Sequence, residues 1–201
     1  MHPLFVGNHP AIDFLNTALA PNGEPIETIG DSKAYLEWLV AVGLLERAAA
    51  DKLARRVGAK ALDEAAAEAR KVREWARDWL ARWRASPHRD YREELAVLNN
   101  LLSRQRYSRQ VVAARGELKV VEHPHINADA LIALVATQFA ELITKEEPAL
   151  VKDCAGSACT LWFLDQSKAH RRLFCSPSAC GNRAKVAAFR DRRRITPRAL
   201  E

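Results

Sequence analysis

The sequence predicts a mainly α-helical protein of the α+β class. Its N-terminal domain is expected to be helical with one β-hairpin, and a small treble-like zinc-binding segment is expected to follow at the C-terminal end. Three observations support this fold class. Apolar residues recur at helical spacing through most of the first 147 residues. β-Branched residues gather in one stretch, residues 106–122, around a glycine turn. All four cysteines lie between Cys154 and Cys180, in a segment too small to build much apolar core of its own.

Composition predicts a globular protein with its positive charge at one end. The chain has 201 residues, of which 48% are hydrophobic and 28% charged, and a net charge of +6. Residues 152–201 hold eleven Lys/Arg and four Asp/Glu, so the surplus positive charge and any polyanionic partner are expected there. The apolar stretch Leu131–Ala140 is too short to cross a bilayer. The N-terminus does not resemble a signal peptide, and we expect a cytoplasmic protein without a membrane partner.

The first expected helix spans residues 11–20 and carries three polar residues on adjacent turns, Asp13, Asn16 and Thr17. Two interpretations of these residues remain open. They line a pocket for a small-molecule effector, or they tie the helix to a neighbouring loop through buried hydrogen bonds. The structural role is favoured, because buried polar groups usually have partners.

Capping residues and apolar spacing predict the remaining helices of the domain, at about residues 32–42, 46–57, 60–84, 90–105 and 128–144. In the fourth of these we expect Leu95, Leu98 and Leu102 to face the core. Tryptophans recur at every fourth position from residue 75 to residue 83, a stripe that is more typical of a core than of a cofactor site. Valine pairs on either side of Arg115-Gly116 predict the hairpin.

The cysteines form two pairs, Cys154/Cys159 and Cys175/Cys180, each enclosing four residues and separated from each other by fifteen. Four thiolates suit the tetrahedral coordination of Zn²⁺, so we expect one structural zinc ion per chain. A disulfide would need an oxidising compartment, and a redox dithiol usually has a two-residue spacer. His170 lies between the pairs and could replace a cysteine, although a solvated role is favoured. A hairpin of residues 160–164 and 171–174 is expected to bring the pairs together.

A basic helix is expected to begin near Gly181. Val186 and Phe189 form a narrow apolar seam with cations on both flanks, so the helix can pack on a small zinc core and still present its arginines outward. Such a helix can contact phosphates and enter the major groove, or it can simply be a solvated terminal helix. The candidate nucleic-acid-binding residues are Asn182, Arg183, Lys185, Arg190, Arg192, Arg193 and Arg194. Asn182 or Arg183 could instead donate a hydrogen bond to a cysteine sulfur.

The segment resembles the CGNR zinc finger, through the tetrapeptide that begins at Cys180, the Phe163-Leu164-Asp165 strand end, Ser167 and the Arg171-Arg172 run. It departs from that pattern at Phe174, where the family usually has tryptophan, and at Pro177, where methionine is frequent. The N-terminal part is similar to the ABATE domain, through the opening AIDFLNT at residues 11–17 and the YLEWL motif at residues 35–39. The resemblance covers nearly the whole chain and implies a bacterial transcription regulator that binds DNA through its finger.

Two domains are therefore predicted, a regulatory or dimerisation domain at residues 1–147 and a zinc finger at residues 148–201. No catalytic motif is present in the sequence, and we expect a protein that is not an enzyme. Three functions remain open: a duplex DNA-binding regulator, an RNA-binding protein, and a protein-interaction module in which zinc is only a staple. One finger makes few base contacts, so a homodimer is possible.

Overall fold

The computed structural model describes residues 4–21 and 23–195, with side chains only as far as residue 190. Seven α-helices and three two-stranded antiparallel sheets lie within these ranges, which confirms the predicted fold class. The chain divides into two compact units. The helical unit contains Thr28–Pro148, and the cysteine unit contains Leu4–Glu27 together with the chain from Ala149 onward. None of the helices described is both long enough and apolar enough to cross a bilayer.

These compact units differ from the predicted domains at one place. Residues 4–27 were expected in the N-terminal domain, but they belong to the same unit as the cysteines. The reason lies in their contacts: Leu164 N donates to Gly7 O at 2.8 Å, and Ala20 N donates to Thr160 Oγ1 at 2.8 Å. The opening segment thus completes the small sheet and core of the cysteine-bearing segment.

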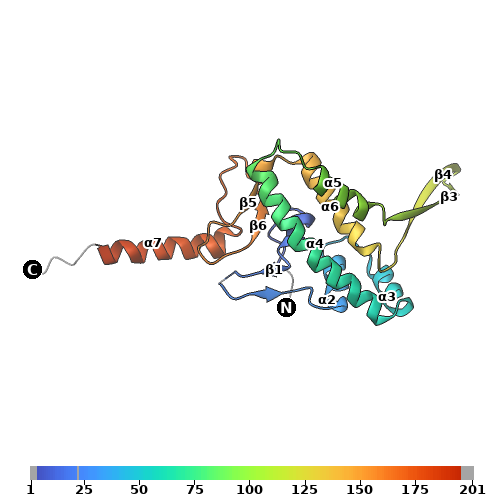
Figure 1. Cartoon of the computed structure of the whole chain (residues 1–201), viewed down its shortest axis with the longest axis horizontal. Coiled ribbons are helices and arrows are strands. Elements are labelled where there is room, and N and C mark those ends of the chain that lie inside the picture. The colour runs from blue at the N-terminus through green and yellow to red at the C-terminus, as the bar shows by residue number, and fades with distance from the viewer. Residues whose placement is uncertain (1–3, 22, 196–201) are drawn as a thin grey trace, which may run out of the picture. The chain divides into compact units, whose positions relative to one another are not determined.

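The helical unit is built from five helices that follow one another along the chain (Figure 1). They are α2 (Ser32–Ala41), α3 (Arg47–Arg56), α4 (Ala59–Ala85), α5 (Arg92–Leu102) and α6 (Leu131–Lys145). Asp31 caps α2 by accepting a hydrogen bond from Ala34 N at 2.7 Å, as the capping rule predicts. The apolar helix α6 contacts both α4 and α5, and seven of its residues are buried. It therefore forms the centre of the unit.

The buried faces mostly follow the predicted periodicity. Trp79 and Trp83 are buried on α4, and the Trp79 ring lies 5.2 Å from that of Trp75 and 6.5 Å from that of Tyr91. One expectation on α5 is wrong, because Leu95 is exposed and Leu101 is buried in its place. The buried face of this helix is formed by Leu98, as predicted, together with Leu101.

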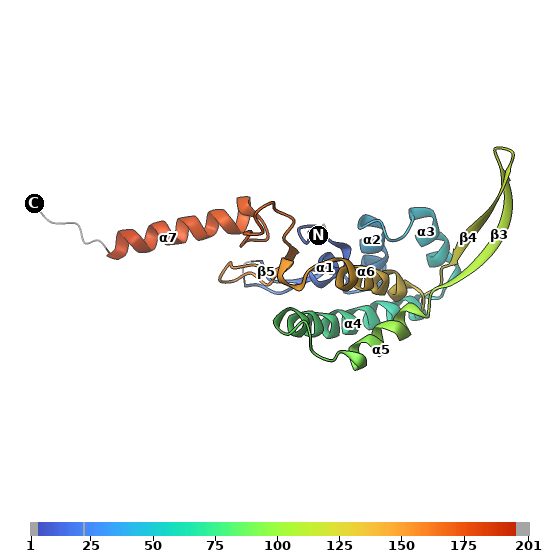
Figure 2. The same ribbon diagram turned by 90° about the horizontal axis from the view of Figure 1, so that it is seen from above.

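A two-stranded ribbon, β3 (Arg106–Ala114) and β4 (Glu117–His125), projects from the helical unit between α5 and α6 (Figure 2). Arg115 and Gly116 form its two-residue turn with φ values of 54° and 83°. Two consecutive positive φ values match the twist of a hairpin, and glycine adopts such a φ without steric cost. The nine residue pairs run in register from Arg106↔His125 to Ala114↔Glu117.

The cysteine unit begins with α1 (Pro10–Leu15), which is shorter than the helix predicted for residues 11–20. His9 caps α1, and Asn16 ends it. The chain then extends into β1 (Ala18–Leu19), which pairs with β2 (Ile26–Glu27). Leu19 is buried against Leu161, Phe163 and three of the cysteines. The helix therefore ends early because the following residues contribute a strand to the core around the cysteines.

The second part of the cysteine unit contains a short sheet and a long helix. Strand β5 (Val151–Asp153) pairs with β6 (Trp162–Leu164), and a turn of π-helix (Pro177–Gly181) leads into α7 (Asn182–Ile195). The predicted pairing of residues 160–164 with residues 171–174 is wrong. Residues 166–173 instead form a loop around Asp165, and Leu173 O accepts a hydrogen bond from Ala155 N at 2.8 Å.

Gly7 provides the first testable prediction, because no side chain fits at this position. A Cβ atom there would lie 2.8 Å from Asp13 Oδ1 and 2.9 Å from both Asp13 N and Ile12 Cγ2. We expect Gly7→Ala to lower the stability of the cysteine unit by about 1–3 kcal/mol, because both neighbours are themselves buried. Thermal unfolding of the full chain would measure the loss. Gly58→Ala is the matched control, since its Cβ meets nothing within 4 Å, and an effect of equal size in both variants would contradict the steric explanation.

Candidate metal centre and basic helix

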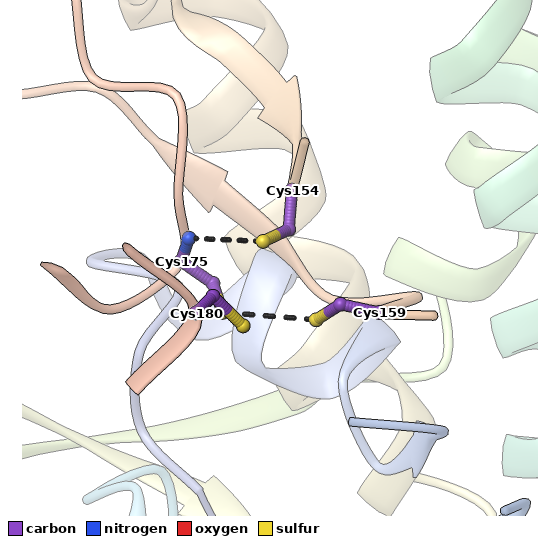
Figure 3. Close-up of side chains that lie close together, drawn as sticks. All are labelled: Cys154, Cys159, Cys175 and Cys180. Atoms are coloured by element: carbon purple, nitrogen blue, oxygen red, sulfur yellow. Dashed lines mark hydrogen bonds between the residues drawn. The ribbon is translucent and has the colours of Figure 1, made fainter. Parts of the chain in front are cut away.

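The four cysteines converge on one point in the cysteine unit (Figure 3). Their Sγ atoms all lie within 4.8 Å of one another. Cys175 Sγ lies 3.5 Å from Cys180 Sγ and 3.8 Å from Cys159 Sγ. A tetrahedron of sulfur atoms at about 2.3 Å from a zinc ion has edges of about 3.8 Å. The spacing therefore fits four ligands around one ion, and it is far too long for disulfide bonds of about 2.05 Å.

Three of the cysteines are positioned by regular structure or by a tight turn. Cys154 follows β5, and its N–H donates to Leu161 O at 2.8 Å, which fixes it beside β6. Gly156 gives the first pair a compact turn, since a Cβ there would lie 3.2 Å from Cys159 Cβ. Cys180 lies in the π-helical turn that leads into α7. The last ligand is therefore rigidly connected to the helix.

Burial of the cysteine side chains makes their thiols hard to deprotonate unless a positive charge lies nearby. Burial raises the pKa of the Cys159 thiol to about 11, and neighbouring cysteines add to the shift. Burial also raises the pKa of the Cys175 thiol. At Cys180 burial acts in the same direction, but the hydrogen bond from Arg183 and those from the other cysteines outweigh it and lower the pKa. A cation within such a cluster favours the thiolates, and four thiolates are the donor set that zinc prefers.

Arg183 places a cation in direct contact with one of the sulfur atoms. Its Nη2 donates to Cys180 Sγ at 2.9 Å. The sequence left open which residue of the CGNR tetrapeptide would bond to a cysteine sulfur, and in the structure it is Arg183 rather than Asn182. A groove of about 480 Å³ runs beside these residues and is lined by Cys159, Cys180 and Arg183. Cys159 is the only half-buried member of the four-cysteine cluster, so this groove is the accessible side of the site.

A buried carboxylate, Asp165, holds the loop before the second cysteine pair. Its Oδ1 accepts hydrogen bonds from Ser167 N and Ser167 Oγ at 3.1 and 2.6 Å, and its Oδ2 accepts from Arg172 N at 2.9 Å and from Lys152 Nζ at 2.6 Å. Burial alone would raise the pKa of Asp165, but these donors outweigh it and hold the pKa far below its usual range. His170 belongs to this network and not to the metal cluster, because its Nδ1 lies 3.1 Å from Asp165 O.

Arg172 extends from this network toward the cysteines. Its guanidinium donates to Phe174 O at 2.9 Å, to Val6 O at 3.3 Å and to Cys175 O. Its Cζ also lies 4.3 Å from the centre of the Phe163 ring, in a cation–π contact. Arg172 thereby joins the third cysteine to β6 and to the N-terminal segment. Apart from the Arg171-Arg172 run, no sequence pattern indicated this role.

The polar residues of the opening motif have structural partners. The Asn16 side chain pairs with both backbone groups of Trp162, since Oδ1 accepts from Trp162 N at 2.8 Å and Nδ2 donates to Trp162 O at 2.9 Å. Asp13 Oδ1 accepts from Gly7 N at 2.8 Å, and Thr17 Oγ1 donates to Phe14 O at 2.7 Å. Burial raises the pKa of Asp13 to about 6, despite hydrogen bonds from the backbone.

These contacts decide between the two interpretations of the motif. All three side chains are buried, and the amide of Asn16, which is 2% exposed, takes the place of a strand next to β6. None of the three lines the groove beside the cysteines. The structure therefore supports the structural role of Asp13, Asn16 and Thr17 and gives no support to an effector pocket at these residues.

The basic helix α7 begins directly after the last cysteine and is exposed along its described side chains. Asn182, Lys185 and Arg190 are exposed. Val186 and Phe189 are 48% and 53% exposed, so this seam is not buried against the core around the cysteines. The core is already filled by Leu19, Leu161 and Phe163. The side chains of the other candidates, Arg192, Arg193 and Arg194, lie outside the described residues.

Comparison with known families divides the chain near residue 148, as the sequence predicts, and assigns residues 8–27 to the first region although they pack with the cysteines. A model described as "Putative stress-induced transcription regulator" (ABATE) matches residues 8–146. A model described as "CGNR zinc finger" matches residues 151–193, which include the four cysteines and most of α7. No curated protein matches the chain.

Proposed function

Since the chain belongs to the ABATE family and ends in a CGNR zinc finger, we propose that it is a transcription regulator that binds duplex DNA through α7. In this proposal one zinc ion per chain occupies the Cys154, Cys159, Cys175 and Cys180 site. Four sulfur ligands leave no coordination position for water or substrate, so the ion has a structural rather than a catalytic role. The protein is accordingly proposed not to be an enzyme.

The observation that carries the proposal is the direct connection between the metal site and the basic helix. Cys180 lies in the last part of the π-helical turn, which ends at Gly181, and Asn182 is the first residue of α7. Arg183 is held against Cys180 Sγ, which fixes the rotation of the first helical turn. A helix whose first turn is fixed by a metal presents its next cations in one orientation. Lys185 and Arg190 are exposed and project from different sides of the helix, as required of groups that contact two phosphate strands.

The exposed seam of α7 is compatible with major-groove entry. Asn182 and Val186 share one face of the helix at 100° per residue, between the flanks that carry Lys185 and Arg190. Asparagine can form paired hydrogen bonds with adenine, and an apolar side chain can contact the methyl group of thymine. RNA recognition usually stacks several bases on aromatic side chains, and Phe189 is the single aromatic residue in the sequence of α7, so this arrangement favours duplex reading over an RNA-binding role.

The helical unit contains a candidate site for effector sensing. A groove of about 400 Å³ lies there between α3 and the base of the ribbon. Its lining includes four groups that can donate hydrogen bonds to an anion: Lys52, Arg56, His123 and His125. We propose this groove, rather than the Asp13 region, as the place where a small anionic effector would bind.

The DNA proposal predicts that Lys185→Ala with Arg190→Ala weakens binding to all duplex sequences. Each phosphate contact contributes about 0.9 to the slope of log K against log salt, so the double variant should reduce that slope by about two. Fluorescence anisotropy on random duplex DNA at several salt concentrations would measure it. Lys71→Ala with Arg55→Ala is the control, because it removes the same charge from exposed positions of the helical unit. Equal binding by parent and Lys185/Arg190 variant at every salt concentration would overturn the proposal.

A further inference from the structure

One face of the β3–β4 ribbon is mostly apolar and contains a single ion pair. Residues that pair across an antiparallel ladder point to the same side, and successive pairs alternate between the two sides. The register places four pairs on one face: Tyr107↔Pro124, Arg109↔Glu122, Val111↔Val120 and Ala113↔Leu118. We call this set the ribbon face.

The large apolar side chains of the ribbon face are unusually exposed. Tyr107 is 57% exposed, Val111 and Val120 are 64% exposed, and Leu118 is 79% exposed. The valines of the opposite face, Val112 and Val121, are half-buried. An isolated two-stranded hairpin is only marginally stable in water, and a contiguous exposed apolar patch typically marks an interaction site. The ribbon face is therefore a surface that requires a partner.

We propose that this partner is a second copy of the same chain, packed ribbon face to ribbon face about a two-fold axis that runs along the ribbon. Each residue of β3 has a ladder partner on β4 of its own chain. Under this axis, the residue of β3 faces that same β4 residue in the second copy. Arg109 then lies over Glu122 of the second copy, and Val111 lies over Val120 of the second copy. The same operation places the large Leu118 over the small Ala113 of the second copy.

The charge pattern is what identifies a second copy rather than a different partner. The ribbon face carries one cation and one anion, Arg109 and Glu122, whose Nε and Oε1 atoms lie 2.9 Å apart within the ribbon. A face with no net charge has nothing to attract a polyanion. In an interface with two-fold symmetry, however, the cation of each chain faces the anion of the other chain, so two pairs of opposite charges form. Sheets packed face to face are about 10 Å apart, and alternating large and small residues fill that space.

The test uses charge reversal in the full-length, zinc-loaded protein, with sedimentation velocity from about 1 µM to about 100 µM, a range that detects micromolar dissociation constants. The parent is expected to dimerise with increasing concentration. In a dimer of the Arg109→Glu variant, the new carboxylate of each chain faces Glu122 of the other chain, so two pairs of like charges form. In a dimer of the Glu122→Arg variant, the new guanidinium group of each chain faces Arg109 of the other chain, and again two pairs of like charges form. Each single variant should therefore dimerise at least about tenfold more weakly.

Mixing the two single variants provides the decisive measurement. In the mixed dimer, each Glu of the Arg109→Glu chain faces an Arg of the Glu122→Arg chain, so association should return to about the parental level. Mixing leaves the ion pair within each ribbon broken, and a recovery can only come from contact between chains. Gln110→Glu, on the opposite face, should have no effect and serves as the control.

Three outcomes would overturn the inference. A parent that remains monomeric throughout would exclude a second copy as the partner. Single variants that dimerise as well as the parent would exclude the ribbon face as the interface. Folded single variants, checked by circular dichroism, that fail to associate on mixing would exclude the proposed two-fold arrangement.

Discussion

Replacing Cys175 with serine is expected to unfold the cysteine unit and to leave the helical unit folded. Structural zinc contributes roughly 10–16 kcal/mol in small fingers at neutral pH, far more than one lost side-chain contact. Three of the four cysteines also belong to the apolar core that contains Leu19, Leu161 and Phe163. Loss of the ion should therefore remove both the cross-link and the packing, and the effect should reach the N-terminal segment that shares this core.

Hydrogen exchange would measure this effect at two amides. Trp162 N–H is held by Asn16 Oδ1 at 2.8 Å, and Leu164 N–H is held by Gly7 O at 2.8 Å. Both should lose protection in Cys175→Ser and in the parent treated with a chelator, whereas amides of α4 and α6 should keep theirs. Ser178→Ala, a change of an exposed side chain near the same cysteine, should leave all four regions protected. Protected Trp162 and Leu164 amides in the metal-free protein would show that the unit does not depend on zinc.

The second large effect is expected from Asp165→Asn. The carboxylate is fully buried and accepts four hydrogen bonds, one of them from a lysine. The side-chain nitrogen of the asparagine would occupy the position of either Oδ1 or Oδ2, where it would face hydrogen-bond donors. The neutral amide would also leave Lys152 without its counter-ion. Breaking a buried pair from one side typically costs about 3–5 kcal/mol. The loop that carries Arg172 should then become disordered, and zinc retention should fall in competition with a chelator.

The pH dependence of this deficit follows from the pKa of Asp165. Its donors hold the folded-state pKa far below the ordinary value, so the stabilisation is present above the unfolded pKa and is lost only as pH falls through the folded pKa. Between pH 6 and pH 8 the difference between Asp165→Asn and the parent should therefore remain constant, because this window lies above the unfolded pKa of about 4. Ser167→Ala, which removes one of the four hydrogen bonds, should cost only about 1 kcal/mol. Equal losses in the two variants would show that the charge of Asp165 is not important.

Local sequence patterns predicted much of this molecule. The helices of the helical unit follow from apolar periodicity and caps such as Asp31, and the ribbon follows from valine pairs around Arg115-Gly116. The four cysteines that come together are the four that their spacing indicated. In each case the signal lies within a few residues, because helical turns, hairpins and ligand pairs are local structures.

The contacts that were missed join residues that are distant in the sequence. Nothing near Asn16 indicates that its amide pairs with the backbone of Trp162, which lies 146 positions away. The sequence could not distinguish the observed pairing of β5 with β6 from the predicted hairpin of residues 160–164 and 171–174. Both arrangements satisfy the same pattern of β-branched and aromatic residues. Arg183 and Arg190 have the same charge in the sequence, and only the structure shows that Arg183 is bound to a sulfur atom.

The participation of residues 4–27 in the cysteine unit has a consequence for the order in which the chain matures. During translation, α1 and β1 leave the ribosome first, while their partners Trp162 and Leu164 follow about 120 residues of helical unit later. Contacts of such high sequence separation form slowly, because the closure of a long loop precedes any gain from the contact. The apolar side chains of Ile12, Phe14 and Leu15, all fully buried in the folded chain, therefore stay accessible to chaperones on the nascent chain until the segment with the cysteines emerges. Metal capture and the burial of the first helix thus become a single late event, and a finger excised at residue 148 would lack the residues that complete it.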